Sequence, residues 1–244
     1  MRALDARDVL WLWDACVTLH PIDRTLTMLR AGLPEVPFDV LAALPIGERE
    51  RRAAALRVTT FGSTAEAADA CPACGVSHEV DPPLDAILES VPVCVDPVPL
   101  SMGGYDLLVR VLDSRDQAAI THCEDAEQAR TQLLQRCVMA ASRSSERVEV
   151  ADLPTEVVSE IAETLALRDS HAETLITLTC TGCGRPWTTV FDAGEFLWRE
   201  VVMHARRLLR EIDALARTYH WSEADVLAMS AQRREAYLEL VGGT

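Results

Sequence analysis

Two copies of the pattern Cys-x-x-Cys-Gly constrain this chain more than any other feature of its sequence. They are Cys71-Pro-Ala-Cys74-Gly75 and Cys180-Thr-Gly-Cys183-Gly184. Each is typical of a zinc knuckle, a tight turn that presents two thiolates to one metal ion, with a glycine that lets the backbone turn without a Cβ clash. A structural zinc ion takes four ligands in a tetrahedron, so the two knuckles together complete one site. We therefore predict a structural zinc ion held by Cys71, Cys74, Cys180 and Cys183.

The two knuckles are far apart in the sequence, and this separation shapes the expected fold. The chain must leave the metal site after Cys74 and return to it at Cys180. The entropic cost of closing such a loop grows only logarithmically with its length, so the long excursion is no obstacle. Structural zinc binds small peptides with about 10–16 kcal/mol, enough to decide whether a region folds. The knuckles should therefore clasp two distant parts of the chain together.

Two other interpretations of these cysteines stay open. Cys71-Pro-Ala-Cys74 also resembles a thioredoxin-type redox motif, and the thiols could bind nothing. A redox motif of that type needs a strand before it and a helix after it. The sequence predicts the reverse order here, with a short helix over 65–70 opened by a capping box at Ser63 and Glu66, and a strand over 76–80. The pattern therefore favours zinc.

The overall charge restricts the partners that the chain can bind. The 244 residues carry a formal net charge of −15, and 49% of them are hydrophobic. The hydrophobic content predicts a packed core rather than disorder. The acidic surface argues against general nucleic-acid binding, which needs Lys and Arg for the phosphates, and against attachment to anionic lipid. Arg206, Arg207 and Arg210 form a basic run, but acidic neighbours offset it, so we expect a solvated helix face.

The sequence also predicts a cytoplasmic location. Asp5, Asp8 and Asp14 interrupt the region where a secretory signal would have its apolar segment. No run approaches the ~20 apolar residues that a membrane helix needs. Eight cysteines in such a chain are typical of a reduced protein that uses some of them for metal.

The remaining cysteines and the histidines offer little catalytic chemistry. His78 could replace a thiolate at the zinc, but the complete set of four knuckle cysteines makes this unnecessary. His122 and Cys123 could form a second metal site with Cys94, but adjacent side chains in a helix point in different directions. We expect the four cysteines outside the knuckles to be small buried hydrophobes: Cys16, Cys94, Cys123 and Cys137.

We predict that the chain is not an enzyme. It has no phosphate-binding loop, metalloprotease motif or nucleophile elbow. With all four zinc positions filled by protein, no position remains for a reacting water. Tryptophans that prove to be exposed would instead be natural anchors for a partner protein. The five are Trp11, Trp13, Trp187, Trp198 and Trp221.

Hydrophobic periodicity and turn residues predict a mixed α+β fold. Both ends of the chain read as helical and should pack together, the knuckles form the two halves of a split zinc ribbon, and the middle is an inserted small α/β subdomain. Within it we expect an extended region around 93–98, a strand over 105–112 and a helix over 124–141, and after the ribbon a long helix over 195–219. The five stretches are 1–62 (helical), 63–83 (first half of the ribbon), 84–170 (inserted subdomain), 171–193 (second half of the ribbon) and 194–244 (helical).

Several short motifs in the outer thirds of the chain resemble one protein family, the T-even-phage-type baseplate hub assembly chaperones. In the first third they are Leu44-Pro-Ile-Gly47-Glu-Arg-Glu-Arg51, Leu56-Arg57, Thr60-Phe61-Gly62 and the first knuckle. In the last third they are the second knuckle, Trp187, Phe191-Asp192, Phe196-Leu197-Trp198, Leu215-Ala216, Tyr219-His220-Trp221-Ser222-Glu223 and Arg233-Arg234 to Tyr237-Leu238. The chain departs from the family's pattern at Thr181-Gly182, where a Pro-x pair is expected, and at His78, where an acidic or apolar residue is more usual.

The resemblance implies a cytoplasmic, non-enzymatic protein that helps the baseplate or hub of a contractile tail to assemble by binding its proteins. Such proteins occur in contractile-tailed phages and in phage-tail-like contractile injection systems. Two alternatives stay open: a zinc-ribbon regulator that binds nucleic acid, and a structural component of the finished baseplate. The first needs a basic ribbon, yet the residues around the knuckles offer Arg185 against several acidic side chains, Glu66, Asp69, Glu79, Asp81, Glu173 and Asp192.

Overall fold

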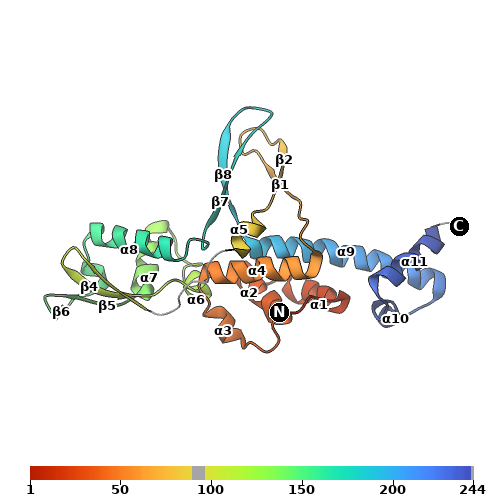
Figure 1. Cartoon of the computed structure of the whole chain (residues 1–244), viewed down its shortest axis with the longest axis horizontal. Coiled ribbons are helices and arrows are strands. Elements are labelled where there is room, and N and C mark those ends of the chain that lie inside the picture. The colour runs from red at the N-terminus through yellow and green to blue at the C-terminus, as the bar shows by residue number, and fades with distance from the viewer. Residues whose placement is uncertain (90–96, 243–244) are drawn as a thin grey trace.

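The computed structural model describes residues 1–89 and 97–242 of the chain. Figure 1 shows a helical body, a ribbon of strands that projects from it, and a small α/β part at one end of the body. The mixture of helices with small antiparallel sheets confirms the α+β class predicted from the sequence. None of the described helices is long and apolar enough to cross a membrane.

Helices from both ends of the chain build the helical body. They are α1 (Ala6–Cys16), α2 (Pro21–Gly32), α3 (Phe38–Ala42), α4 (Ile46–Phe61) and α9 (Ala193–Tyr219). The long α9 packs against α1, α2 and α4, and all four helices contribute to one core. Leu12, Leu29, Leu56 and Leu197 are completely buried there, one from each helix. Apolar residues recur every three or four positions along α9, which gives it one buried face.

The far end of α9 carries two shorter helices, α10 (Glu223–Leu227) and α11 (Ala231–Gly242), both packed against it. The α9 helix ends at Tyr219, and the next residue, His220, caps it in the left-handed conformation with φ of 57°. A capping box at Ser222 and Asp225 opens α10. The Trp221 ring lies 4.5 Å from Tyr219 and 4.8 Å from Tyr237, and so joins α9 to α11.

Two antiparallel hairpins form the ribbon. The first is β1 (Ala67–Ala70) with β2 (Ser77–Val80), and the second is β7 (Thr174–Thr179) with β8 (Pro186–Phe191). The predicted helix over 65–70 is therefore wrong. Alanine favours a helix in isolation, but Ala67 to Ala70 pair residue by residue with β2, and this pairing outweighs the local preference.

The α/β part contains a four-stranded antiparallel sheet and three helices. Its strands are β3 (Val98–Met102), β4 (Tyr105–Val109), β5 (Val138–Arg143) and β6 (Glu146–Arg147), in that order across the sheet. Its helices are α6 (Ser114–Ala119), α7 (Ala126–Cys137) and α8 (Thr155–Arg168), with a 3₁₀ turn at Val150–Asp152. A separate core, which includes Val109, Val138 and Ile161, lies between sheet and helices. A short helix, α5 (Leu84–Leu88), packs instead against α4.

Two predictions for this part are wrong, and a third is largely untested. The helix expected over 124–141 ends at Cys137, because the next residues pair with β4 as strand β5. The strand expected over 105–112 ends at Val109, where the register of β4 against β5 shifts. Most of the extended region expected at 93–98 lies outside the described residues, and Val98 begins β3.

Polar contacts hold the α/β part against the N-terminal end of α4. Both carboxylate oxygens of Asp169, just after α8, accept hydrogen bonds from the Gly47 N–H, at 3.1 and 3.0 Å. The buried Arg49 guanidinium donates to Ser114 and Gln117 of α6. The Ile46 N–H donates to the carbonyl of Leu112.

Candidate metal centre

The four knuckle cysteines meet at the tip of the ribbon. Their Sγ atoms all lie within 4.8 Å of one another. Cys71 Sγ is 3.8 Å from Cys183 Sγ, and Cys74 Sγ is 3.4 Å from Cys180 Sγ. Both distances are far longer than the ~2.05 Å of a disulfide. Four sulfurs bound at ~2.3 Å around one tetrahedral ion would be about 3.8 Å apart, so this donor set fits a metal ion that prefers thiolates.

The two knuckles share one backbone geometry. In each, the N–H of the glycine donates to the carbonyl of the first cysteine, Gly75 to Cys71 and Gly184 to Cys180, both at 2.8 Å. Gly75 and Gly184 have φ of 76° and 72°, a region that other residues enter at a cost. The glycine after the second cysteine of each knuckle therefore allows the tight turn, as expected from the sequence. Thr181-Gly182, where the resemblance expects Pro-x, leaves the turn intact.

The sulfur of Cys180 receives more hydrogen bonds than that of its counterpart in the other knuckle, Cys71. The backbone N–H groups of Gly182 and Cys183 point at it, at 3.3 and 3.4 Å. Burial raises the pKa of the Cys180 thiol, but the Cys183 N–H, the Cys74 thiol and His78 outweigh burial and lower the pKa to about 5. These contacts favour the thiolate of Cys180, the form that binds metal.

His78 lies next to the cluster without being part of it. Its Nε2 is 3.3 Å from Cys180 Sγ, and its ring lies 5.3 Å from the Trp187 ring. The Trp187 indole N–H donates to Asp69 across the two hairpins, at 3.0 Å. The His78 side chain on β2 and the Trp187 side chain on β8 thus join the two halves of the ribbon below the knuckles.

Neither knuckle has the surroundings of a thioredoxin-type motif. Strand β1 precedes the first knuckle and β2 follows it, whereas the redox motif needs a helix after its cysteines. The expectation of a helix before the knuckle was wrong, but the strand after it is present. The second knuckle lies between β7 and β8 in the same way.

The helical body contacts the ribbon at the two places where the chain enters the ribbon and leaves it. The α4 helix ends just before the first hairpin, and α9 begins just after the second. On the buried face between them, Arg57 of α4 pairs with Glu200 of α9 at 3.0 Å and also donates to the carbonyls of Gly62 and Thr64. The buried Glu50 carboxylate accepts the N–H groups that begin α9, at Ala193 and Gly194. Anions are stabilised at a helix N-terminus, so this placement also fixes the start of α9.

The other predicted metal residues do not gather into a second site. Among the described residues, the knuckle cysteines are the one group of His, Cys, Asp and Glu side chains close enough to hold an ion. His122 is exposed, Cys123 donates to Gln132, and Cys94 lies outside the described residues.

The expectation of buried, unreactive thiols holds for two of the remaining cysteines. Cys16 and Cys137 are buried, and burial raises the pKa of each thiol to about 11. Cys123 is only half-buried, because it lies in the turn before α7 rather than in a core.

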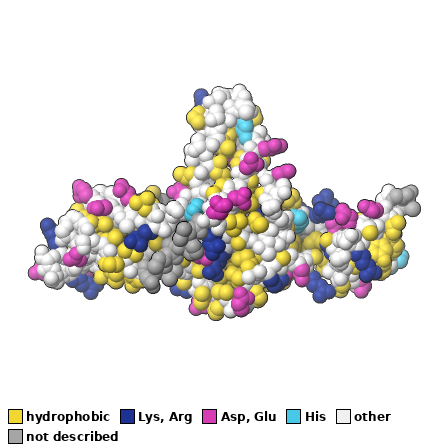
Figure 2. All heavy atoms as spheres, in the orientation of Figure 1, with side chains coloured by type: hydrophobic (Ala, Val, Ile, Leu, Met, Phe, Trp, Pro, Cys, Tyr) yellow, Lys and Arg dark blue, Asp and Glu magenta, His cyan; other side chains and the backbone are white. Residues whose placement is uncertain are grey.

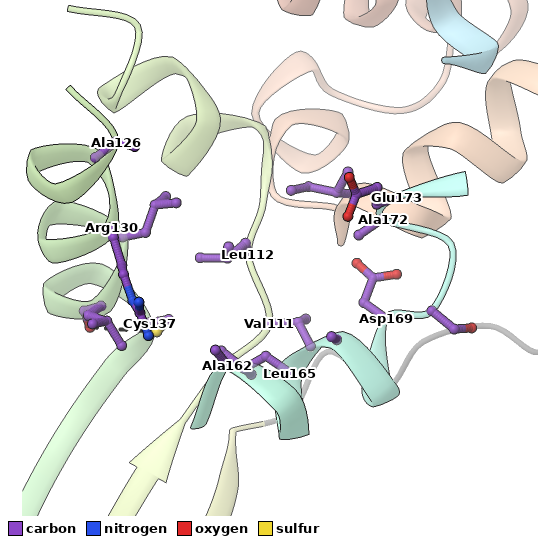
Figure 3. Close-up of a pocket in the computed structure, with 16 residues that line it drawn as sticks. Val111, Leu112, Ala126, Arg130, Cys137, Ala162, Leu165, Asp169, Ala172 and Glu173 are labelled. Atoms are coloured by element: carbon purple, nitrogen blue, oxygen red, sulfur yellow. Dashed lines mark hydrogen bonds between the residues drawn. The ribbon is translucent and has the colours of Figure 1, made fainter. Parts of the chain in front are cut away.

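Sequence reasoning missed an apolar cavity of about 540 Å³ between α7, α8 and the segment that leaves β4 (Figure 3). Leu112, Leu133 and Leu165 line it, and Arg130, Asp169 and Glu173 lie at its margins. It lies beside the junction with α4. No motif marks it, because its walls come from apolar positions on three separate elements.

The tryptophans divide between core and surface. Trp198 is buried under the Arg24 guanidinium, 4.7 Å from its ring, whereas Trp11 on α1 is 55% exposed. Trp13 and Trp221 pack at the margin of the body core.

No protein-family model, curated protein or solved structure matches this chain.

Proposed function

We propose that this chain is a zinc-containing, non-enzymatic protein that assists assembly of the baseplate or hub of a contractile tail. It would act by binding tail proteins in the reducing cytoplasm, where thiolates persist as metal ligands. The resemblance in its outer thirds is the source of this proposal, and the metal centre supplies the rigidity that a binding surface needs.

One observation supports the proposal above the others. Segments that carry the resemblance are far apart in the sequence, yet they meet at the base of the ribbon. The Arg57 guanidinium lies 5.5 Å from the Phe196 ring and pairs with Glu200, and Phe196 lies 5.6 Å from Phe191. If these motifs come from one protein family, they are expected to lie together in the fold.

Zinc is the ion we propose for the four thiols. Four thiolates with this spacing are typical of structural zinc sites, which are closed to water. In that role the ion would join the two hairpins and leave no position for a reacting water, so the proposed function is binding rather than catalysis.

The proposal is tested by affinity purification of the tagged full chain from cells that produce the contractile particle, followed by mass spectrometry. Co-purification of baseplate or hub proteins, absent from a tag-only control, is the expected result. Recovery of nucleic acid or transcription proteins without any tail protein would contradict it and favour the regulator. Purified mature particles separate the remaining alternative, because an assembly factor is absent from them and a structural component is present at fixed copy number.

The charges around the knuckles argue against a zinc-ribbon regulator that binds nucleic acid. In Figure 2, acidic side chains gather along one side of the ribbon and at its base. In the sequence, Asp69 and Glu79 belong to the first hairpin, and the other acidic residues lie in the segments beside the two hairpins: Glu66, Asp81, Glu173 and Asp192. Phosphate groups would be repelled by them.

A further inference from the structure

The α9 helix has a face that no part of the described chain covers. Its buried face packs on α1, α2 and α4, but Arg199, Met203, Arg206 and Arg210 are exposed on the other side. These positions recur every three or four residues, so they form one stripe. The stripe borders a shallow hollow that also includes Trp198 and Val202.

The stripe is apolar in its middle along the helix axis, between Arg199 and Arg206. Met203 is 56% exposed, and Val202 beside it is half-buried. Met adapts its shape to different neighbours and is common on surfaces that bind helices. From Glu195 to Arg210 the hollow follows α9 for about 22 Å, which matches a partner helix of about four turns.

The two ends of the stripe along the helix axis are basic, and two of its arginines have no acidic partner. Among the described residues, Arg206 and Arg210 form no ion pair, whereas Arg207 and Arg217 on the neighbouring face pair with Glu211 and Asp213. The expectation that acidic neighbours neutralise the whole run is thus met for Arg207 but not for these two. The surface around Arg206 and Arg210 is therefore positive, although the chain as a whole has a net charge of −15.

We infer that this stripe, which we name the α9 stripe (Arg199, Val202, Met203, Arg206 and Arg210), binds an acidic amphipathic helix of a partner protein. The partner would place apolar side chains on Val202 and Met203 and carboxylates beside Arg206 and Arg210, where opposite charges steer and orient the complex. The inference rests on the proposed protein-binding function and names the chemistry of the segment bound.

An acidic helix fits this surface better than a nucleic acid does. The apolar part of the stripe would lie against phosphates and gain nothing from them. Glu195, at one end of the hollow, is already bound by Arg24 and Arg199, so it does not repel an acidic helix as a free carboxylate would.

The test uses the purified full chain and a fluorescein-labelled helical peptide of about 18 residues, with leucines in the middle of one face and glutamates toward both ends of that face. Fluorescence anisotropy should show binding that weakens as salt rises. The same peptide with lysines in place of glutamates should bind at least about tenfold more weakly. Arg206→Glu/Arg210→Glu should weaken binding of the glutamate peptide at least about tenfold, and Met203→Asp should weaken it as well.

A matched control changes the same charge elsewhere. Arg130→Glu/Arg147→Glu alters two exposed arginines of the α/β part and should leave peptide binding unchanged. Thermal unfolding of each variant shows whether it is folded, so loss of binding can be assigned to the surface.

Three outcomes would overturn the inference. Equal binding of the lysine and glutamate peptides would remove the charge argument. Tighter binding of a single-stranded oligonucleotide, lost in Arg206→Glu/Arg210→Glu, would make the stripe a phosphate-binding surface. A dimer of the wild type, seen by light scattering and dissociated by the same variant, would make it an interface between copies of this chain.

The inference and the proposed function can fail separately. Tail proteins that co-purify equally with the wild type and with Arg206→Glu/Arg210→Glu would refute the α9 stripe and leave the proposed function standing. Charge-dependent binding of the glutamate peptide, without any tail protein in the affinity purification, would do the reverse.

Discussion

Arg57 on α4 and Glu200 on α9 form a buried ion pair between residues 143 positions apart, with the guanidinium and carboxylate 3.0 Å from each other. The pair lies beneath the ribbon, between the helix that leads into the first hairpin and the helix that follows the second. Arg57 also donates hydrogen bonds to the carbonyls of Gly62 and Thr64, in the segment between α4 and the first hairpin. One side chain therefore links α4, α9 and the first hairpin.

Removing one partner of this pair should be costly. Arg57→Leu leaves the Glu200 carboxylate buried without a counter-charge, and we expect a loss of about 3–5 kcal/mol in the free energy of unfolding. Chemical denaturation measures it. The double variant Arg57→Leu/Glu200→Leu should lose less than Arg57→Leu alone, because no charge is left unpaired.

The matched control for this pair is Arg217→Leu, since Arg217 and Asp213 form an exposed pair on the same helix, α9. We expect a change below about 0.5 kcal/mol there. If Arg57→Leu cost no more than Arg217→Leu, the buried pair would have no role in joining α4 to α9.

Gly47 should tolerate no side chain. A Cβ at this position would overlap Asp169 Oδ1 and lie 3.1 Å from the Ala172 backbone nitrogen. Gly47→Ala would force Asp169 away from its hydrogen bonds at the start of α4, at a cost of about 1–3 kcal/mol. Gly242→Ala is the control, because nothing lies within 4 Å of the added Cβ there. Equal melting temperatures for both variants would show that the α/β part is not held through this contact.

Stability should depend on pH through Asp116. Burial raises the pKa of this carboxyl, but hydrogen bonds from Arg110, the Asp113 N–H and Arg136 outweigh burial and lower the pKa to about 2. A pKa below the unfolded value stabilises the fold at higher pH, and this contribution is lost as pH falls from about 4 to 2. Asp116→Asn should therefore cost about 2 kcal/mol at pH 7, and the difference from wild type should shrink over that acidic range.

The comparison is made by chemical denaturation of both proteins at each pH, because loss of any bound metal in acid would affect them alike. Asp152→Asn, at an exposed carboxylate, should show no such difference. The prediction would be wrong if the difference in free energy of unfolding between Asp116→Asn and wild type stayed constant from pH 7 to pH 2.

Sequence patterns foresaw the elements whose signals are local. The knuckles are set by cysteine spacing and a glycine, and α9 by an apolar residue every three or four positions. Strand β1 was missed because its alanines favour helix until β2 pairs with them, and β5 because Val138 continues an apolar helical pattern without a break.

Contacts between distant segments were beyond the reach of these patterns. Nothing near Arg57 in the sequence indicates Glu200 as its partner. That Arg206 and Arg210 have no acidic partner among the described residues depends on where α9 places their side chains. The basic run was noted, but acidic residues close in sequence suggested neutralisation that the helix geometry does not provide for those two arginines.

Each knuckle cysteine should be needed for the metal. A single Cys74→Ser substitution removes one thiolate from the tetrahedron, so we expect loss of bound metal and a lower melting temperature. Cys123→Ser, at a half-buried thiol outside the cluster, is the control. It should retain the bound metal and the melting temperature of the wild type. Retained metal and unchanged melting in all four knuckle variants would show that these thiols do not form the site.

The most direct test of the account is the metal content of the purified wild-type chain, measured by elemental mass spectrometry together with titration of free thiols. We expect one zinc ion per chain, with four thiols that react only after the zinc is chelated. A chain without bound metal, whose knuckle cysteines react freely or form disulfides, would contradict the metal clasp on which the account rests.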